Sequence, residues 1–201
     1  MVMRMNLLAF NHRPATACGR KWISGFTLIE VLTVITIAAL LMALGVPSYQ
    51  YVTNANRISG EVNGLLGDMQ YARSEAIKEG QTVTVCSSAN STSAAPTCSG
   101  STAWQSGWIV FSDVNGTGAV DSASDTILRV QSAFPLGDTF DANNSMKFVT
   151  FNREGFALNL NNPPITVTLH AAVPNNGSTR CLQITIVGQL TTETAGTGAC
   201  T

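Results

Sequence analysis

The stretch that decides the fold is "SGFTLIEVLTVITIAALLMALGVPSY", which runs from Ser24 to Tyr49. Between Phe26 and Val46 it is apolar, apart from threonines and one carboxylate, Glu30. These 21 residues would form a helix about 32 Å long, which is enough to cross a bilayer. A lone acid inside a membrane helix costs on the order of 3 kcal/mol and usually marks a functional contact. The sequence therefore predicts a membrane helix whose acid needs a partner.

The charges around this segment predict its orientation. All charged side chains before Gly25 are basic, and no basic residue follows the segment until Arg57. The four basic residues are Arg4, Arg13, Arg20 and Lys21. By the positive-inside rule, the N-terminus lies in the cytoplasm and the rest of the chain lies across the membrane. A cleaved secretory signal fits less well, because its apolar region spans only about 7–15 residues.

Composition limits the partners of the exported part. Charged residues make up 11% of the 201 residues, and the mean hydropathy is +0.18, which suits a membrane-anchored exported domain. Four of the eleven basic residues precede Gly25, so seven remain against all twelve acidic residues, a formal net charge of −5. A domain with this balance does not attract nucleic acid through bulk electrostatics.

The cysteines predict disulfides rather than a metal centre. Cys18 precedes the apolar run, and the other four follow it as two sequence-close pairs. They lack CxxC spacing, and only His170 could join them, which argues against zinc. Four cysteines permit three pairings; short loops favour Cys86–Cys98 and Cys181–Cys200, formed in an oxidising compartment.

A helical pattern continues beyond Pro47. Apolar residues recur at alternating spacings of four and three, and Gly80 provides a C-cap. This seam consists of Tyr51, Ala55, Ile58, Val62, Leu65, Met69, Ala72 and Ala76. The opposite face carries Asn54, Arg57, Glu61, Asp68, Arg73 and Glu75. The seam could form a coiled coil, but we expect it to cover a sheet.

After Gly80 the apolar period changes to two, which indicates strands separated by turns. The expected strands are "QTVTVC", "WQSGWIVFSD", "DTILRVQ", "SMKFVTFN", "ITVTLH" and "RCLQITIV". The predicted fold class is α+β, with one long N-terminal helix packed on antiparallel β-structure.

The opening stretch also resembles a processing signal. "GFTLIE", followed by an apolar run and "VPSY", is similar to the prepilin signal of type IV pilins and type II secretion pseudopilins. The resemblance implies that prepilin peptidase cleaves after Gly25 and methylates the new N-terminal residue, Phe26. It implies that Glu30 pairs with the N-terminal amine of a neighbouring subunit, and that Pro47 bends the helix.

The resemblance also divides the chain into four parts. Residues 1–25 would be a cleaved leader, 26–46 the transmembrane and assembly helix, 47–80 its amphipathic continuation, and 81–201 a periplasmic or extracellular β-domain. The implied partners are other pilins or pseudopilins, prepilin peptidase, inner-membrane lipid and an assembly platform. The implied location is the inner membrane of a Gram-negative bacterium and the filament built from it.

Later motifs narrow the resemblance. "ARSEAIKEGQTVTVCSS", "WQSGWIVFSDVNGTG", "FNREGFA" and "RCLQITIVGQL" are similar to H-type pseudopilins and FimT-like minor pilins. This subgroup serves either type IV pili or type II secretion; the cysteine pairs and the Ser/Thr/Asn-rich surface favour the pilus.

The subgroup raises the alternative of DNA uptake. Some FimT-like pilins bind DNA through a Gly-Arg-x-Arg motif near the C-terminus. The aligned residues here are Gly188, Gln189, Leu190 and Thr191, so both arginines are absent, and the nearest cation is Arg180. Phosphate contacts need cations, so nucleic acid is not an expected partner.

Other candidate chemistry has a simpler interpretation. Asp113, Asn115 and Asp121 resemble part of a calcium loop with Gly118 in place, but Ser124 stands where a bidentate glutamate belongs. We expect an Asn-Gly turn there and predict no metal or cofactor. His170 has no catalytic partner in sequence, and Trp104 and Trp108 are expected in the core. The expected function is structural, not enzymatic.

Overall fold

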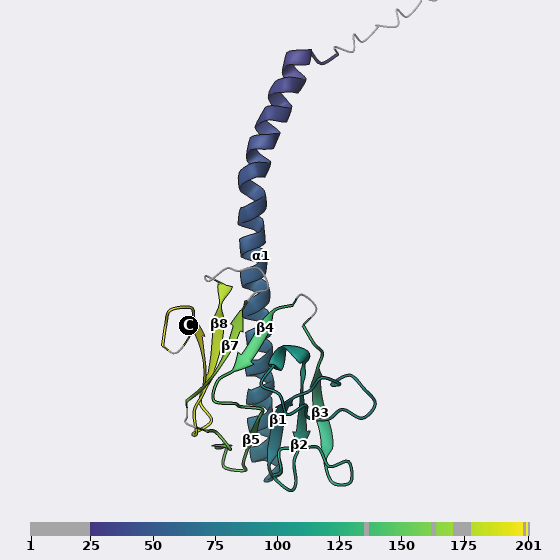
Figure 1. Ribbon diagram of the computed structural model, residues 1–201, viewed down its shortest axis with the longest axis vertical. Coiled ribbons are helices and arrows are strands. Elements are labelled where there is room, and N and C mark those ends of the chain that lie inside the picture. Colours follow the sequence, from purple (N-terminus) through teal and green to yellow (C-terminus); the bar gives the residue numbers. More distant parts are fainter. Residues whose placement is uncertain (1–24, 135–136, 162–163, 171–177, 199, 201) are drawn as a thin grey trace, which may run out of the picture. The chain divides into compact units, whose positions relative to one another are not determined.

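The computed structural model describes residues 25–134, 137–161, 164–170, 178–198 and 200. The chain divides into two units, residues 1–43 and 44–201. One helix, α1 (Leu28–Glu79), supplies the described structure of the first unit and begins the second. All the strands belong to the second unit (Figure 1).

Two antiparallel sheets form the second unit. The first has the strand order β3-β2-β1-β5-β6 and the second the order β4-β7-β8-β9. The strands of the first sheet are β1 (Val83–Ser87), β2 (Trp108–Ser112), β3 (Thr126–Gln131), β5 (Phe148–Phe151) and β6 (Ala157–Leu158). Those of the second are β4 (Thr139–Ala142), β7 (Ile165–His170), β8 (Arg180–Ile184) and β9 (Leu190–Thr194). This arrangement confirms the α+β class.

The seam of α1 forms the centre of the core. Its side chains from Ile58 to Ala76 are at most 1% exposed, and they pack with apolar residues of both sheets. The seam therefore covers sheets, as expected, and is not a coiled-coil stripe in this chain. The prediction was wrong for Tyr51, which is 48% exposed. The buried part of the seam begins only at Ile58.

The helix ends where the sequence predicts. Gly80 follows the last residue of α1, has φ +70° and donates its amide to the Ala76 carbonyl at 3.0 Å. This is the left-handed C-cap that glycine adopts without steric cost.

The second expected strand is shorter than its sequence pattern. Trp104–Ser106 forms a single 3-10 turn, η1, and β2 begins only at Trp108. Between them Gly107 has φ +103°, and a Cβ there would lie 2.5 Å from the Gln131 carbonyl oxygen. The chain therefore turns at Gly107 instead of continuing as an extended strand.

Two disulfides close loops of the second unit. Cys86 bonds Cys98, and Cys181 bonds Cys200, which are the pairs that short loops favour. Cys86 also belongs to a second, smaller cluster with Ile109 and Phe111, on the far side of the first sheet from the main core. Its disulfide thus fixes the loop after β1 onto that cluster.

Candidate assembly site

The apolar half of α1 has no cover from the described part of the chain. Phe26, just before α1, and Leu28 and Leu40 within it are 80%, 81% and 69% exposed, although burying each such side chain would contribute about 2 kcal/mol. By length and composition, α1 is long and apolar enough to cross a membrane. An exposed apolar surface of this extent marks a site of interaction with a membrane or with other proteins.

Glu30 lies in the first turn of this bare segment. Its amide donates to Thr27 Oγ1 at 3.3 Å, so Thr27 caps the helix, and its carbonyl accepts the Thr33 hydroxyl at 2.9 Å. Its carboxylate is favoured by the positive N-terminal end of the helix dipole. Within the described residues no ion pair involves Glu30.

Gly25 and Pro47 flank the segment. Gly25 lies outside the helix, is exposed, and a Cβ built on it would meet nothing within 4 Å. Packing in this chain therefore does not require a glycine at position 25. Pro47 lies within α1, which continues through it; having no amide hydrogen, it cannot donate to the preceding turn.

Polar side chains beside the seam bind α1 to the sheets, which the sequence did not predict. Asp68 accepts the Trp108 indole N–H at 2.8 Å and forms a 3.0 Å ion pair with Arg129. Arg129 also lies 3.8 Å from the centre of the Tyr71 ring. The only available sequence signal was that Asp68 immediately precedes the seam residue Met69; nothing local marked Arg129, which lies on β3.

Arg73 joins two turns that belong to different sheets. Its Nε donates to the Gly155 carbonyl at 2.9 Å, and its Nη2 donates to the Val187 carbonyl at 3.2 Å. Gly155 lies between β5 and β6, and Gly188 lies between β8 and β9. A Cβ on Gly188 would stand 2.2 Å from the Gly155 oxygen, so the two turns touch backbone to backbone.

Arg73→Met should loosen this junction. The substitution keeps the aliphatic stem but removes two charge-assisted hydrogen bonds, so we expect a loss of about 2 kcal/mol in the free energy of unfolding. Denaturant unfolding of the full chain in detergent micelles measures it. Arg153→Met is the control, because Arg153 is exposed and pairs only with its neighbour Glu154. Equal losses of unfolding free energy in both variants would contradict a stabilising contact between Arg73 and the two turns.

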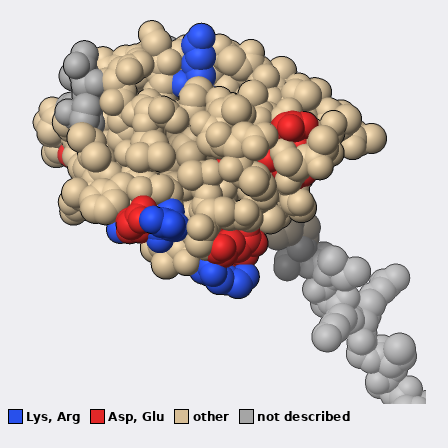
Figure 2. Space-filling model, turned by 90° about the horizontal axis from the view of Figure 1, so that it is seen from below, with Lys and Arg blue, Asp and Glu red and all other residues tan. Residues whose placement is uncertain are grey.

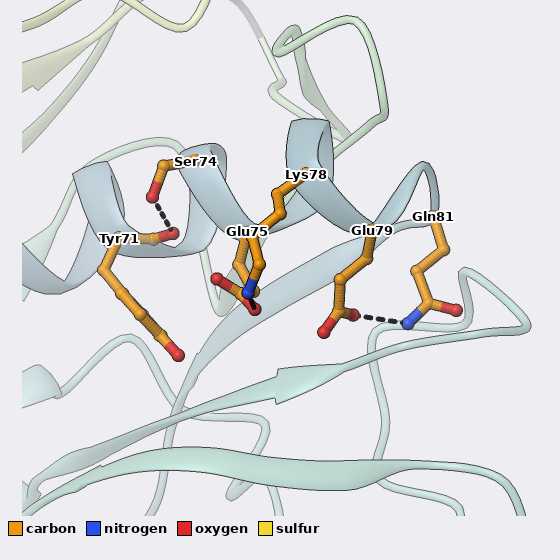
Figure 3. Close-up of polar contacts among 6 residues, drawn as sticks. All are labelled: Tyr71, Ser74, Glu75, Lys78, Glu79 and Gln81. Carbon is orange, nitrogen blue, oxygen red and sulfur yellow. Dashed lines mark hydrogen bonds and ion pairs between the residues drawn. The ribbon is translucent and has the colours of Figure 1, made fainter.

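The last turn of α1 carries its own polar contacts (Figure 3). Lys78 Nζ donates to Glu75 Oε1 at 2.7 Å, and Gln81 Nε2 donates to Glu79 Oε2 at 2.6 Å. The hydrogen bond from Lys78 lowers the pKa of Glu75, and the same contact raises the pKa of Lys78. A cation here also suits the negative C-terminal end of the helix dipole.

The calcium-like loop is organised by a buried aspartate. Asp113 is fully buried; its Oδ2 accepts the Thr84 hydroxyl at 2.7 Å and the Gly118 amide at 2.8 Å. Its Oδ1 accepts the Thr117 amide at 3.0 Å. Since its carboxylate faces these donors, Asp113 shapes the turn and is not offered to a metal ion. No cluster of metal-ligating side chains occurs within the described ranges.

The two tryptophans and the histidine considered in the sequence analysis contact only neighbouring parts of the fold among the described residues. Trp104 and Trp108 are at most 1% exposed and lie in the core, as expected. His170 ends β7 on the surface, with Nδ1 3.3 Å from Thr179 Oγ1.

The segment aligned with the DNA-binding motif contributes no cation of its own; the neighbouring Arg73 donates its hydrogen bonds to the backbone carbonyls of Gly155 and Val187. Gly188 is buried in the turn between β8 and β9, and Leu190 and Thr191 begin β9. Seen from below, the domain is mostly uncharged, and several of the scattered basic side chains lie beside acidic ones (Figure 2). Phosphate binding needs a cluster of cations, which this face does not present.

Comparison with known proteins agrees with this architecture. Residues 61–189 match the family described as Type II transport protein GspH. No curated protein matches the chain. Two crystal forms of the type IV minor pilin FimU of Pseudomonas aeruginosa share the fold, with TM-scores of 0.50 and 0.53. They are 19% and 18% identical; the matches cover 70% and 73% of this chain and 93% of each FimU chain.

A long helix with a bare apolar half, packed on antiparallel sheets by its second half, defines a type IV pilin-like protein. The match spans more than half of the 201 residues, and this chain belongs to the GspH family.

Proposed function

We propose that this chain is a minor pilin or pseudopilin, a structural subunit of a type IV pilus or of a type II secretion pseudopilus. The observation that carries the proposal is the bare apolar half of α1 on a domain of the GspH family. A subunit of this kind is held in the membrane by α1 until it enters a filament. There, other pilin helices replace lipid around the same surface. The role requires assembly and no catalysis.

The leader would be removed before assembly. Prepilin peptidase would cleave after Gly25 and methylate the amine of Phe26. The exposed, non-helical backbone at Gly25 supports this assignment, because a protease needs a substrate segment that is accessible and not held in a helix. The absence of any steric need for glycine there also points to recognition by another protein.

Glu30 would then bind the new amine of a neighbouring subunit. In the membrane its carboxylate is costly, and a protonated amine inside a filament would offset that cost. The pairing thus makes insertion into the filament more favourable than remaining alone in lipid. It also sets the axial offset between two subunits, because only one register brings the charges together.

The membrane topology follows from charge and disulfides. Arg20 and Lys21 would hold the leader in the cytoplasm, and the second unit would lie in the periplasm until assembly. The two disulfides support this side of the membrane, because they persist in oxidising compartments. The partners would be other pilins or pseudopilins, the peptidase, inner-membrane lipid and the assembly platform.

Glu30→Ala should separate processing from assembly. Cleavage after Gly25 should continue and give the mature mass. Incorporation into filaments should fall by at least about tenfold, because a buried amine would lack its partner. Quantitative immunoblotting of sheared filaments against whole cells measures the ratio. Glu30→Asp keeps the charge and should recover part of it. Normal incorporation of the alanine variant would exclude the pairing.

Photo-crosslinking in living cells tests the function itself. A probe at Leu32 would face the partners of the bare helix, and mass spectrometry would identify what it captures. Other minor pilins and a major pilin would place the chain in a type IV pilus. Pseudopilins and the secretion platform would make it the H-type subunit of type II secretion. Capture of no filament subunit would overturn the proposal.

A further inference from the structure

Three charged side chains meet where α1 faces the segment before β4. Arg57 and Glu61 lie one helical turn apart on α1, and Asp138 immediately precedes β4. Arg57 forms a bidentate ion pair with Asp138: Nη1 lies 2.8 Å from Oδ2, and Nη2 donates to Oδ1 at 3.1 Å. The Asp138 side chain is fully buried. This ion pair is therefore a long-range connection between α1 and the second sheet.

Glu61 adds a second carboxyl group to the same cluster. Its Oε2 is inaccessible to solvent and has no hydrogen-bond partner among the described residues. Two carboxylates and one guanidinium would leave a net negative charge here. A partly desolvated site does not accept uncompensated charge cheaply, so a proton is the simplest compensation.

The described residues that line the groove beside Glu61 offer no other counter-charge. Glu61 lines an open groove of about 300 Å³ between α1, Trp108 of β2 and the residues after β3. Apart from Arg57 and Glu61, the residues lining this groove are uncharged; they are Gly60, Gly64, Trp108, Gln131, Ser132, Ala133 and Phe134. Arg129 of β3 is engaged in an ion pair with Asp68. Arg57 is thus the one cation lining the described groove, and Asp138 already engages it.

Titration of Glu61 follows from this arrangement. Burial, and next the negative charge of Asp138, raise the pKa of Glu61 from 4.5 to about 7, although Arg57 opposes the rise. The cluster therefore changes charge near neutral pH.

We propose that Arg57, Glu61 and Asp138 form a pH-sensitive latch, in which a proton on Glu61 leaves Arg57 to Asp138 and so holds the segment before β4 against α1. When the proton leaves, two adjacent carboxylates repel each other and compete for Arg57. The contact between α1 and Asp138 then weakens. The latch belongs to the second unit and does not depend on which filament the chain enters.

The sign of the pH dependence is fixed by the raised pKa. Between pH 4.5 and 7 the unfolded chain has lost the Glu61 proton and the folded chain keeps it. Raising the pH through this window therefore favours unfolding, by up to about tenfold per pH unit in the folding equilibrium constant. Above about pH 7 both states have lost the proton, and this contribution stops changing.

Unfolding of the full chain in detergent micelles, measured by denaturant titration at pH 5, 6, 7 and 8, tests the latch. Relative to Glu61→Gln, the wild type should lose at least about tenfold in its folding equilibrium constant between pH 5 and 7. Glu154→Gln is the matched control, because Glu154 is exposed and pairs only with Arg153, which lowers its pKa. This control should follow the wild-type profile within that window.

Two site-specific readouts complete the test. In a ¹³C carboxyl NMR titration of the wild type, one glutamate signal, absent from Glu61→Gln, should titrate near pH 7. Hydrogen exchange of the β4 amides, corrected for the intrinsic pH effect, should accelerate at least threefold from pH 6 to 8 in the wild type only. A Glu61 signal that titrates below pH 5, or parallel stability profiles for wild type and Glu61→Gln, would overturn the proposal. If the variant does not fold, the lack of any glutamate signal titrating near pH 7 in the wild type would by itself overturn the proposal.

Discussion

Gly25→Val should leave the chain as an uncleaved precursor. The resemblance to prepilins assigns cleavage to the bond after Gly25, where the exposed, non-helical backbone precedes α1. A branched side chain would obstruct the close backbone approach that glycine permits. We expect the mature form to disappear almost completely, with intact-mass measurement of the purified chain showing only the precursor. An unprocessed chain should also be missing from filaments, since the amine of Phe26 would not be formed.

The structure supplies a matched control for this effect. A Cβ at Gly25 or at Gly45 meets nothing within 4 Å, so the two valine substitutions are equally free of clashes within the chain. Gly45→Val should therefore be cleaved normally. A normal mature mass for Gly25→Val would refute the assigned cleavage site. Loss of cleavage in both variants would point to defective membrane insertion.

Asp113→Ala should be the most destabilising single change in the loop that follows β2. The carboxylate is fully buried and accepts three hydrogen bonds, from Thr84, Thr117 and Gly118. Removing it leaves the buried Gly118 amide without an acceptor, whereas the Thr84 hydroxyl keeps Thr150 as a partner and Thr117 is exposed. A buried unpaired group costs about 1–3 kcal/mol, so we expect a loss of about 2 kcal/mol or more in the free energy of unfolding.

The same loop contains the control. Asp121 is exposed, and its carboxylate accepts the Ala123 amide and the Ser124 hydroxyl at the surface. Asp121→Ala should cost less than about 1 kcal/mol, because water replaces the lost partner. Denaturant unfolding in detergent micelles compares the two variants. Two results together would contradict the role of Asp113: calcium raises the free energy of unfolding of the wild type, and Asp113→Ala and Asp121→Ala lower it equally. The loop would then be a metal site.

The two aspartates show what residue spacing alone leaves undecided. The pattern from Asp113 to Asp121 is compatible with ligands around a cation or with a turn that satisfies its own amides. The choice depends on where the carboxylate of Asp113 points. That direction is fixed by Thr84 on β1, 29 residues away in the chain. Local sequence therefore could not settle the question.

The strands likewise differ in whether their local sequence predicts them. The strong alternation in "ITVTLH" marks β7, which is central in its sheet and has one face in the core. β9 (Leu190–Thr194) was not predicted, because "LTTET" lacks apolar alternation and lies at the edge. Its pairing with β8 forms it, with Cys181 opposite Glu193. β4 and β6 were missed for the same reason, since each is a short strand at the edge of its sheet.

By itself, the sequence determined the length and bareness of the apolar half of α1, the buried seam from Ile58 to Ala76, and the helix end at Gly80. These features depend on periodicity and on the conformational preferences of single residues, so they are local. Tertiary structure alone decided the roles of Arg57, Asp68, Arg73 and Asp113. Each side chain is compatible with an exposed position until a partner distant in sequence is placed beside it. The energy of a buried charge depends on that partner, and only the folded chain brings the two together.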